Sequence, residues 1–305
     1  MILGLVGPTA SGKTRIALGL APQIAAEVLS VDSMQVYRGM DVGTAKPSPM
    51  EQTRVKHHLL DLADPGERFS VAEFQSAARM AMAQVRERGC TPLLVGGSGL
   101  YFRAVADDLA FPPTDATVRA DLEREDLAVL RDRLAAIDPD ASARIQPANK
   151  RRIVRALEVI EITGRPFSSF RTSWDAFATG GLRVAGLRVA PGVLRARITE
   201  RTLAMFAGPL QDETTGLVEG GYRAALSAAA AIGYSDALAV IEGRSSVDDA
   251  VERTVRATID LARRQMRWFK RDPRIHWIDA DELEGATAEV QAYWSERTTA
   301  AAGGA

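Results

Sequence analysis

Short apolar runs alternate with polar, helix-like stretches along the first third of the chain. These runs lie at residues 2–6, 28–31 and 92–95, and a glycine or an aspartate follows each of them. Brief apolar runs bounded in this way are typical of strands buried inside a sheet. Because helical sequence separates the runs, residues 1–110 are predicted to form β-α-β units around a parallel sheet.

The clearest helix in this part is predicted over residues 70–88. Ser70 and Glu73 have the spacing of a capping box, and Gly89 directly follows the last helical turn. A capping box satisfies free amides at a helix start, and glycine readily adopts the left-handed conformation that ends a helix. Both ends of this helix are therefore marked in the sequence.

Proline breaks the pattern in the middle of the chain. The sequence Phe-Pro-Pro at 111–113 is followed by an acidic helical stretch and then by a basic one, and strand-like character returns only at 182–189. We therefore predict a helical insertion domain at 111–181. The α/β core domain is then made of residues 1–110 and 182–305.

Composition narrows the class of protein. A chain of 305 residues with 46% hydrophobic content can bury one large core and a subdomain. The formal net charge is −1, so any affinity for nucleic acid must come from local patches. A single cysteine, Cys90, excludes an internal disulfide and fits a reducing compartment. With no leader and no membrane-length apolar run, we expect a cytoplasmic protein that does not contact the membrane, and we expect a monomer.

A phosphate-binding loop follows the first predicted strand. Residues 7–14, with the sequence GPTASGKT, match the pattern G-x-x-x-x-G-K-[ST], and helix-permissive residues come next. Glycines let backbone amides wrap a di- or triphosphate, and the helix N-terminus adds positive potential. We therefore predict a P-loop-containing parallel sheet flanked by helices, in which Lys13 reaches phosphate oxygens and the Thr14 hydroxyl ligates Mg²⁺. The predicted phosphate-binding residues are Gly7, Pro8, Thr9, Ala10, Ser11, Gly12, Lys13 and Thr14.

Asp32 stands at the carboxyl end of the second predicted strand. In open parallel sheets, ligands bind at this edge. An aspartate there can simply cap a turn, but its place one βα unit after a phosphate loop favours a role in the site. The third run leads instead into Gly96-Gly97-Ser98-Gly99, where nucleotide hydrolases often carry an acid that helps to hold Mg²⁺. This weakens the ATPase interpretation, and Ser98 can either position a nucleophile or cap a helix.

Two predicted helices carry clustered arginines beside an apolar face. In the helix that Asn149 opens, helical spacing separates the arginines Arg151, Arg152 and Arg155 from the apolar residues Ile153, Leu157 and Ile160. In the helix at 247–270, it separates the basic residues Arg256, Arg263, Arg267 and Lys270 from the apolar residues Val251, Val255, Ala262, Met266 and Phe269. Few acids accompany these arginines, so pairing one turn apart is not expected to neutralise them. Solvated surface faces are the alternative, but we favour binding of a phosphate backbone or a diphosphate.

Seven stretches of the chain resemble the tRNA dimethylallyltransferase family, also called tRNA isopentenyltransferases. They occur in order and span nearly the whole chain, at residues 7–14 (GPTASGKT), 32–47 (DSMQVYRGMDVGTAKP), 57–74 (HHLLDLADPGERFSVAEF), 94–102 (LVGGSGLYF), 152–158 (RIVRALE), 231–234 (AIGY) and 262–269 (ARRQMRWF). The resemblance implies transfer of a dimethylallyl group from dimethylallyl diphosphate to N6 of an adenosine. In the family this is the adenosine on the 3′ side of the anticodon, in tRNAs that read codons beginning with U.

The resemblance also implies a role for each candidate residue. The phosphate loop with Mg²⁺ would hold the leaving diphosphate, and Asp32 matches the general base that takes a proton from N6. Ser98 falls where the family usually has a threonine beside the amine. Base flipping would bring the adenine to its contacts, which are Asp32, Ser33, Met34, Gln35 and Ser98. The implied contacts to the tRNA anticodon stem-loop are Arg119, Arg151, Arg152 and Arg155, and the implied diphosphate contacts are Arg263, Arg264 and Arg267.

The sequence departs from the family at two places and leaves other functions open. Residues 146–149 (Gln-Pro-Ala-Asn) differ from the family's usual His-Pro-Asn-Asp, and Ile259 stands at an often basic position. A small-molecule kinase also fits a phosphate loop followed by an aspartate. Prenylation of free AMP or ADP is a closer rival, which the basic insertion disfavours. An RNA-binding regulator that uses nucleotide as a switch leaves Asp32 without a purpose.

Overall fold

The computed structural model describes residues 1–171, 176–178, 180–228 and 231–296. Contacts between Cα atoms divide the chain into two compact units. The core unit consists of Met1–Ala106 and Thr179–Ala305, and the insertion unit consists of Asp107–Ala178. Each unit has its own hydrophobic core, so each is described by itself.

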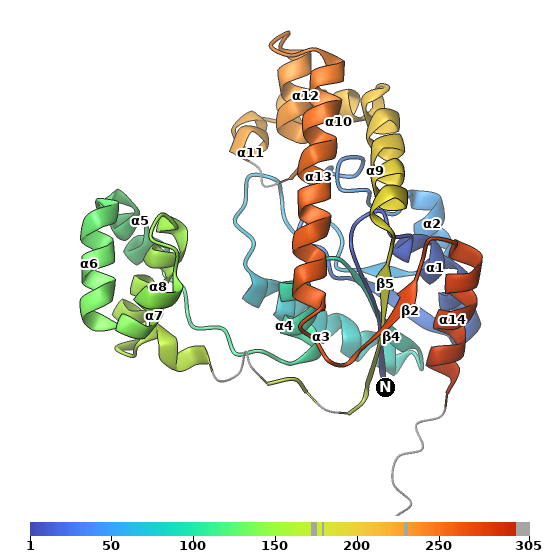
Figure 1. The fold of residues 1–305 in the computed structure, drawn as a ribbon, viewed down its shortest axis with the longest axis horizontal. Helices are drawn as coiled ribbons and strands as arrows, with labels where there is room; N and C mark the ends of the chain where they lie inside the picture. The colour runs from blue at the N-terminus through green and yellow to red at the C-terminus, as the bar shows by residue number, and fades with distance from the viewer. Residues whose placement is uncertain (172–175, 179, 229–230, 297–305) are drawn as a thin grey trace, which may run out of the picture. The chain divides into compact units, whose positions relative to one another are not determined.

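One parallel sheet organises the core unit (Figure 1). Among the described residues its strand order is β3-β2-β4-β1-β5-β6, and every pairing is parallel. The strands are β1 (Ile2–Val6), β2 (Ala26–Ser30), β3 (His57–His58), β4 (Thr91–Gly96), β5 (Leu182–Arg188) and β6 (Ile275–Asp279). The predicted α/β fold with a parallel sheet flanked by helices is confirmed. The short edge strand β3 was not predicted, because two residues show no periodicity.

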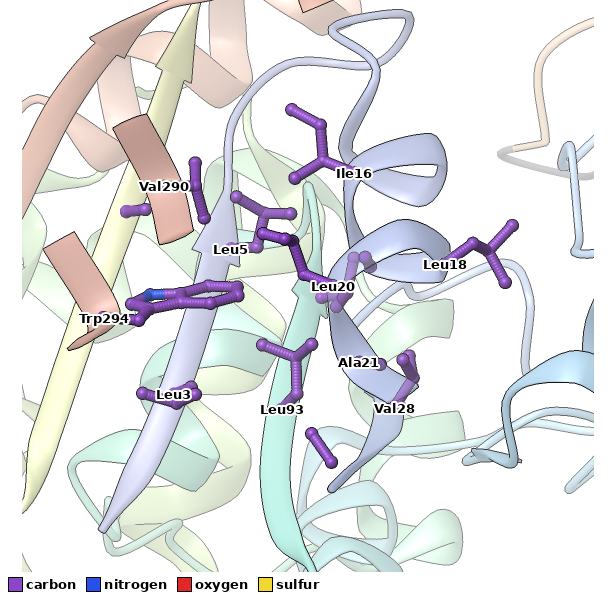
Figure 2. Close-up of a cluster of buried hydrophobic side chains, with 14 of the residues drawn as sticks. Leu3, Leu5, Ile16, Leu18, Leu20, Ala21, Val28, Leu93, Val290 and Trp294 are labelled. Atoms are coloured by element: carbon purple, nitrogen blue, oxygen red, sulfur yellow. The ribbon is translucent and has the colours of Figure 1, made fainter. Parts of the chain in front are cut away.

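Alternating side chains of the strands build a core on each face of the sheet. Leu3 and Leu5 of β1 pack with α1 (Lys13–Leu20) and α14 (Leu283–Ser295) (Figure 2). Val6 of β1 points to the other face, in a cluster with α3 (Val71–Glu87) and α4 (Gly99–Ala106). Successive side chains of a strand point to opposite faces of its sheet. A sheet with helices on both faces therefore needs apolar residues at odd and at even positions of its strands.

Further helices extend the core unit beyond the sheet. They are α2 (Pro49–Arg54), α9 (Pro191–Phe206), α10 (Pro209–Glu219), α11 (Arg223–Ala228), α12 (Tyr234–Ile241) and α13 (Val247–Phe269). Helices α9, α10, α12 and α13 pack on one another around a third apolar cluster. This cluster also takes in Met40, from the segment between β2 and α2. The described helices include none that is long and apolar enough to cross a membrane.

The buried face of α13 differs from the predicted one. Its buried positions are Ala250, Thr254, Thr258, Ala262, Gln265 and Phe269, whereas the predicted Val251, Val255 and Met266 are half-buried. Threonines can line the buried face because their hydroxyls find acceptors. The Thr258 hydroxyl donates to the Thr254 carbonyl at 2.7 Å, and the Thr254 hydroxyl donates to the Asp236 carboxylate at 3.2 Å. A prediction from hydrophobicity alone therefore misses the polar residues on the buried face of α13 and assigns that face to neighbouring positions.

Helices make up most of the insertion unit. It contains α5 (Ala116–Arg124), α6 (Leu127–Ile137), α7 (Pro139–Arg144) and α8 (Lys150–Thr163), followed by a short 3₁₀ helix at Phe167–Arg171. Ile153 and Leu157 of α8 are buried against Leu122, Leu130 and Leu134. The apolar side predicted for the helix opened by Asn149 is therefore the packed side, and the Asn149 side chain caps that helix.

Candidate functional site

The phosphate loop connects β1 to the first turn of α1. Its backbone requires glycine at two positions. A Cβ atom on Gly7 would lie 2.7 Å from the Leu187 carbonyl oxygen, and one on Gly12 would lie 2.3 Å from Cδ2 of Leu283. Both glycines also have positive φ angles, 149° and 91°, which other residues rarely adopt. The predicted loop therefore packs closely against its neighbours at both glycines, and it leads directly into α1.

Lys13 is buried beneath this loop. Its Nζ donates to the Pro8 carbonyl at 2.5 Å and approaches the Ser11 hydroxyl at 3.4 Å. Burial lowers the pKa of Lys13 to about 7, since Asp32 only partly offsets the cost of desolvating the ammonium group. The side chain is thus held inside the loop, where a phosphate oxygen would restore its charge.

A cavity of about 380 Å³ opens over the loop at the carboxyl ends of the strands. At the loop it is lined by Thr9, Ala10, Ser11, Gly12, Lys13, Thr14 and Arg15. The rest of its wall includes Val28, Ser30, Asp32, Gln35, Thr44, Ala45, Pro47, His57, Arg197, Arg201 and Gln265. The structure therefore brings the phosphate loop and Asp32 into one cavity. Gly7 and Pro8 belong to the loop without lining the cavity.

Asp32 presents its carboxylate beside two cationic groups. Burial raises the pKa of Asp32, although the Met34 amide, Lys13, the Gln35 amide and Arg201 all oppose that rise. The Met34 N–H donates to Oδ1 of Asp32 at 2.8 Å, which fixes the orientation of the carboxylate. A carboxylate with a raised pKa is a stronger base, so this environment suits Asp32 to accepting a proton from a substrate.

Ser98 lies next to the Asp32 segment but does not line the cavity. Its hydroxyl oxygen accepts the Ser33 N–H at 3.1 Å, and its own N–H donates to the Val31 carbonyl at 3.2 Å. Ser33 and Met34 likewise sit beside the cavity, whereas Gln35 lines it. In the structure Ser98 therefore holds the turn that carries Asp32.

Two arginines of α9 complete the cavity, and the sequence did not single them out. The Arg201 Nη2 donates to the Thr9 hydroxyl at 2.9 Å, while its Nε is buried with no hydrogen-bond partner in the described ranges of the chain. Burial lowers the pKa of Arg201, and Asp32 opposes this. Arg197 also lines the cavity and donates to the Ala280 carbonyl at 2.9 Å. A four-residue spacing places the two arginines on one helix face, but no sequence pattern says what that face contacts.

Gln265 links α13 to the loop. Its Oε1 accepts the Thr9 N–H at 2.8 Å, and a Cβ atom on Gly97 would meet its Nε2 at 2.3 Å. The amide therefore fits between the phosphate loop and the glycines that follow β4. Gln265 belongs to the stretch at 262–269 on which the family resemblance rests, yet its role was not predicted.

The neighbouring arginines of α13 are exposed. Arg263, Arg264 and Arg267 do not line the cavity of the phosphate loop. Arg263 pairs with Asp260 at 3.0 Å, and Arg256 pairs with Glu252 at 2.5 Å. The expectation that acids would not neutralise these arginines is therefore wrong for both pairs. A diphosphate role for Arg263, Arg264 and Arg267 stays a prediction, because they lie on the exposed side of α13 while Gln265 faces the loop.

In the insertion unit, two predicted tRNA contacts bind a buried carboxylate. Glu158 has no exposed side-chain surface, and it accepts from Arg119 and from Arg155 at 2.7 Å each. Arg155 also donates to the carbonyls of Pro112 and Pro113 at 2.7 and 2.9 Å. Both arginines are therefore partnered within the unit, and for Arg155 this is contrary to the expectation from helical spacing. Arg151 and Arg152 are exposed.

The donor set of the cavity fits a magnesium ion held together with a ligand's phosphate oxygens. Thr14 is exposed and lines the cavity, and Asp32 lines the same cavity. Among the described residues, no cluster of three or more histidine, cysteine or acidic side chains could hold a metal by itself. An ion here would thus depend on the bound phosphates for much of its coordination.

Comparison with known proteins gives one consistent result. The family model described as IPP transferase matches residues 35–272. A tRNA dimethylallyltransferase of Corynebacterium glutamicum is 46% identical over 282 residues, which are 91% of this chain and 94% of that protein. One of Streptomyces coelicolor is also 46% identical, over 93% of this chain and 92% of its own length.

The solved structures that this chain resembles belong to the same kind of enzyme as its sequence relatives. A tRNA isopentenylpyrophosphate transferase of Staphylococcus epidermidis superposes with a TM-score of 0.70 at 32% identity, covering 97% of this chain and 99% of that one. A eukaryotic dimethylallyltransferase acting on tRNA superposes with a TM-score of 0.79 at 25% identity, covering 95% and 77%. With a family model matched over most of the chain and relatives similar along nearly their whole length, the chain belongs to the IPP transferase family.

Proposed function

We propose that the protein transfers a dimethylallyl group from dimethylallyl diphosphate to N6 of an adenosine in tRNA, releasing diphosphate. The target is the adenosine on the 3′ side of the anticodon in tRNAs that read codons beginning with U. Relatives that cover nearly the whole chain are named for this activity. The observation that carries the proposal is the position of Asp32 in the same cavity as Lys13 and Arg201.

Each residue of the cavity has a defined task in this reaction. The exocyclic amine of adenine is a weak nucleophile, since its lone pair is conjugated with the ring. As N6 attacks C1 of the donor, the Asp32 carboxylate accepts the proton that N6 loses. The bond from C1 to the diphosphate oxygen breaks, and its electrons leave with the diphosphate. A positioned base of this kind contributes about 10²- to 10⁴-fold to the rate.

Charge develops on the leaving diphosphate, and the cavity places positive groups around it. Lys13, Arg197, Arg201 and the amides at the N-terminus of α1 face this space. Mg²⁺ bound at Thr14 would supply further neutralisation of the phosphate oxygens. The buried Nε of Arg201 has no hydrogen-bond partner among the described residues, so a phosphate oxygen would satisfy it.

The insertion unit is proposed to bind the tRNA anticodon stem-loop. Arg151 and Arg152 are its exposed candidates for phosphate contacts. Arg119 and Arg155 are proposed to support that surface through Glu158. The comparisons give no support to a kinase or to prenylation of free AMP or ADP.

One assay separates these reactions. The purified protein is incubated with dimethylallyl diphosphate and Mg²⁺, and with unmodified tRNA, AMP or ADP as acceptor. Nucleoside mass spectrometry then reports N6-dimethylallyladenosine. Of the three acceptors, we expect only tRNA to give product. A tRNA in which the target adenosine is replaced by guanosine should give none. Product from AMP at a comparable rate would contradict the proposed substrate, and acceptor-dependent ADP release from ATP would indicate a kinase.

A further inference from the structure

The segment between β2 and α2 forms part of the cavity wall. Thr44, Ala45 and Pro47 line the cavity together with residues of the phosphate loop. Ala45 has a φ angle of 51°, in the left-handed region that disfavours a residue with a Cβ atom. Such a conformation persists only where surrounding contacts hold it in place. The contacts that hold this segment therefore bear on the shape of the site.

A carboxylate from α10 binds the backbone just before this wall. The Glu213 side chain accepts the N–H groups of Asp41 at 2.9 Å, Val42 at 2.8 Å and Gly43 at 3.3 Å. Three consecutive amides that converge on one carboxylate form an anion-binding turn. Hydrogen bonds to a charged acceptor are stronger than neutral ones, so Glu213 fixes this turn more firmly than a single backbone bond would.

Tyr234 of α12 contacts the same carboxylate, that of Glu213. Its hydroxyl donates to Oε1 of Glu213 at 2.6 Å, and its side chain is fully buried. Burial and the charge of Glu213 together raise the pKa of Tyr234, which keeps the phenol protonated as a donor. A Cβ atom on Gly43 would lie 2.3 Å from the ring, so only glycine allows this close approach.

The held turn is connected inward to the cavity through Gln35. The Gln35 Nε2 donates to the carbonyls of Thr44 and Ala45 at 3.2 Å each. Its Oε1 accepts the Ser30 hydroxyl at 2.7 Å. The orientation of this cavity-lining amide therefore depends on where the carbonyls of Thr44 and Ala45 stand.

We propose that Glu213 and Tyr234 are positioning residues for prenyl transfer. They hold the turn at 41–43, and through it the wall at 44–47 and the Gln35 amide, while touching neither the donor nor the base. The proposal rests on the proposed function. The wall at 44–47 affects catalysis only if the cavity binds the dimethylallyl group of the donor as well as its diphosphate. The phosphate loop lies apart from these contacts and is expected to bind diphosphate without them.

The test uses two variants and a matched control in the full-length protein. Glu213→Gln keeps the shape of the side chain but presents an amide N–H to backbone donors. Tyr234→Phe removes only the hydroxyl. Tyr222→Phe removes a hydroxyl from the same apolar cluster, where Tyr222 is half-buried, and is the control. The measurements are steady-state kinetics with dimethylallyl diphosphate and tRNA, the Kd of inorganic diphosphate, and hydrogen–deuterium exchange of the peptide that covers residues 41–47.

We expect Glu213→Gln and Tyr234→Phe to lower kcat/KM for dimethylallyl diphosphate by about tenfold, the effect of losing one charged hydrogen bond. Exchange at 41–47 should accelerate, and the Kd of inorganic diphosphate should stay within about twofold. Tyr222→Phe should change none of these values. If Glu213→Gln does not fold, Tyr234→Phe decides the question.

Two results would overturn the positioning role. One is a wild-type kcat/KM and wild-type exchange in folded variants. The other is a parallel loss of affinity for inorganic diphosphate, which would mean general damage to the site. A wild-type protein that binds diphosphate but transfers no prenyl group would instead contradict the proposed function, and the exchange measurement would still report whether Glu213 holds the turn.

Discussion

Lys13 shows how a single side chain can be prepared for an anionic ligand. Its ammonium group is buried against the Pro8 carbonyl, and desolvation lowers its pKa to about 7. A neutral or partly charged lysine costs less to bury than a fully charged one. Arg201 shares this environment, since its Nε is buried and finds no hydrogen-bond partner in the part of the chain that the structure describes. Both groups would gain from phosphate oxygens that replace the missing solvation.

This arrangement predicts proton uptake when diphosphate binds. The pKa of Lys13 is lowered in the free protein, so the ammonium loses its proton as pH rises through about 7, and a bound anion moves the pKa back up. At pH 7 we expect Lys13 to take up about half a proton per site, rising toward one at higher pH.

Calorimetry of diphosphate binding in buffers with different ionisation enthalpies measures this uptake. Lys13→Met is the reference, because it keeps the protonation change of the ligand itself. Identical proton uptake by the wild-type protein and by Lys13→Met would contradict the account.

At the scale of elements, an ion-pair cluster ties β2 to β3 and to the end of α3. Glu27 of β2 accepts from the Arg88 Nε at 2.8 Å and from its Nη2 at 2.7 Å, and it lies 2.6 Å from the His58 Nε2. The hydrogen bond from Arg88 is the main reason that the pKa of Glu27 is lowered to about 2. A bidentate pair with a largely buried carboxylate is one of the stronger ionic contacts in proteins.

Glu27 is therefore predicted to make stability depend on pH in the acid range. Because its folded pKa is depressed, the stabilisation is complete above the unfolded value near 4.5 and is lost as pH falls toward 2. Glu27→Gln should lower the free energy of unfolding by about 2 kcal/mol at pH 7 and by much less near pH 2. Urea unfolding across this range measures the difference. Glu87→Gln, on the exposed last turn of α3, should show little change, and a pH-independent deficit in Glu27→Gln would contradict the linkage.

Local elements were accessible from the sequence because their signals are local. The loop between β1 and α1 was predicted from glycine spacing, and the α3 capping box from Ser70 and Glu73 alone, which the structure shows bonded as expected. The buried face of α13 was placed slightly off, since its threonines look polar until their hydroxyl acceptors are known. Contacts such as Arg201 with Thr9 join residues far apart in the chain, so no spacing rule predicts them.

On the scale of the whole molecule, the arginines fall into two groups. Some pair with a buried carboxylate and stabilise the fold, and others are exposed and available to bind phosphate. Charge counting in the sequence suggested unpaired basic faces, but it could not show that Glu158 is buried under Arg119 and Arg155. Asp32 was correctly expected at the edge of the sheet because parallel strands bring their carboxyl ends together. The remaining cavity wall, from α9, α13 and the segment at 44–47, depends on tertiary packing and was not predictable.

The two kinds of arginine predict different effects on tRNA binding. Neutralising the exposed Arg151 and Arg152 should weaken binding and reduce the slope of log K against log salt by about one to two, since each phosphate contact releases a counterion. Arg155→Ala should instead lower the stability of the insertion unit by about 2 kcal/mol, because it leaves Glu158 buried with one partner fewer. Filter binding over a salt series and thermal unfolding measure the two effects. An unchanged salt slope in the double variant would refute the phosphate contacts.

The central claim is that Asp32 accepts the adenine proton while the loop beside it holds the departing diphosphate. The most direct test is the single-turnover rate of prenyl transfer by Asp32→Asn, which keeps the shape of the side chain and removes its basicity. We predict a rate at least about 10²-fold below that of the wild type, with the Kd values of tRNA and of diphosphate changed by no more than a few-fold. A wild-type rate, or a loss of tRNA binding that accounts for the whole defect, would contradict the claim.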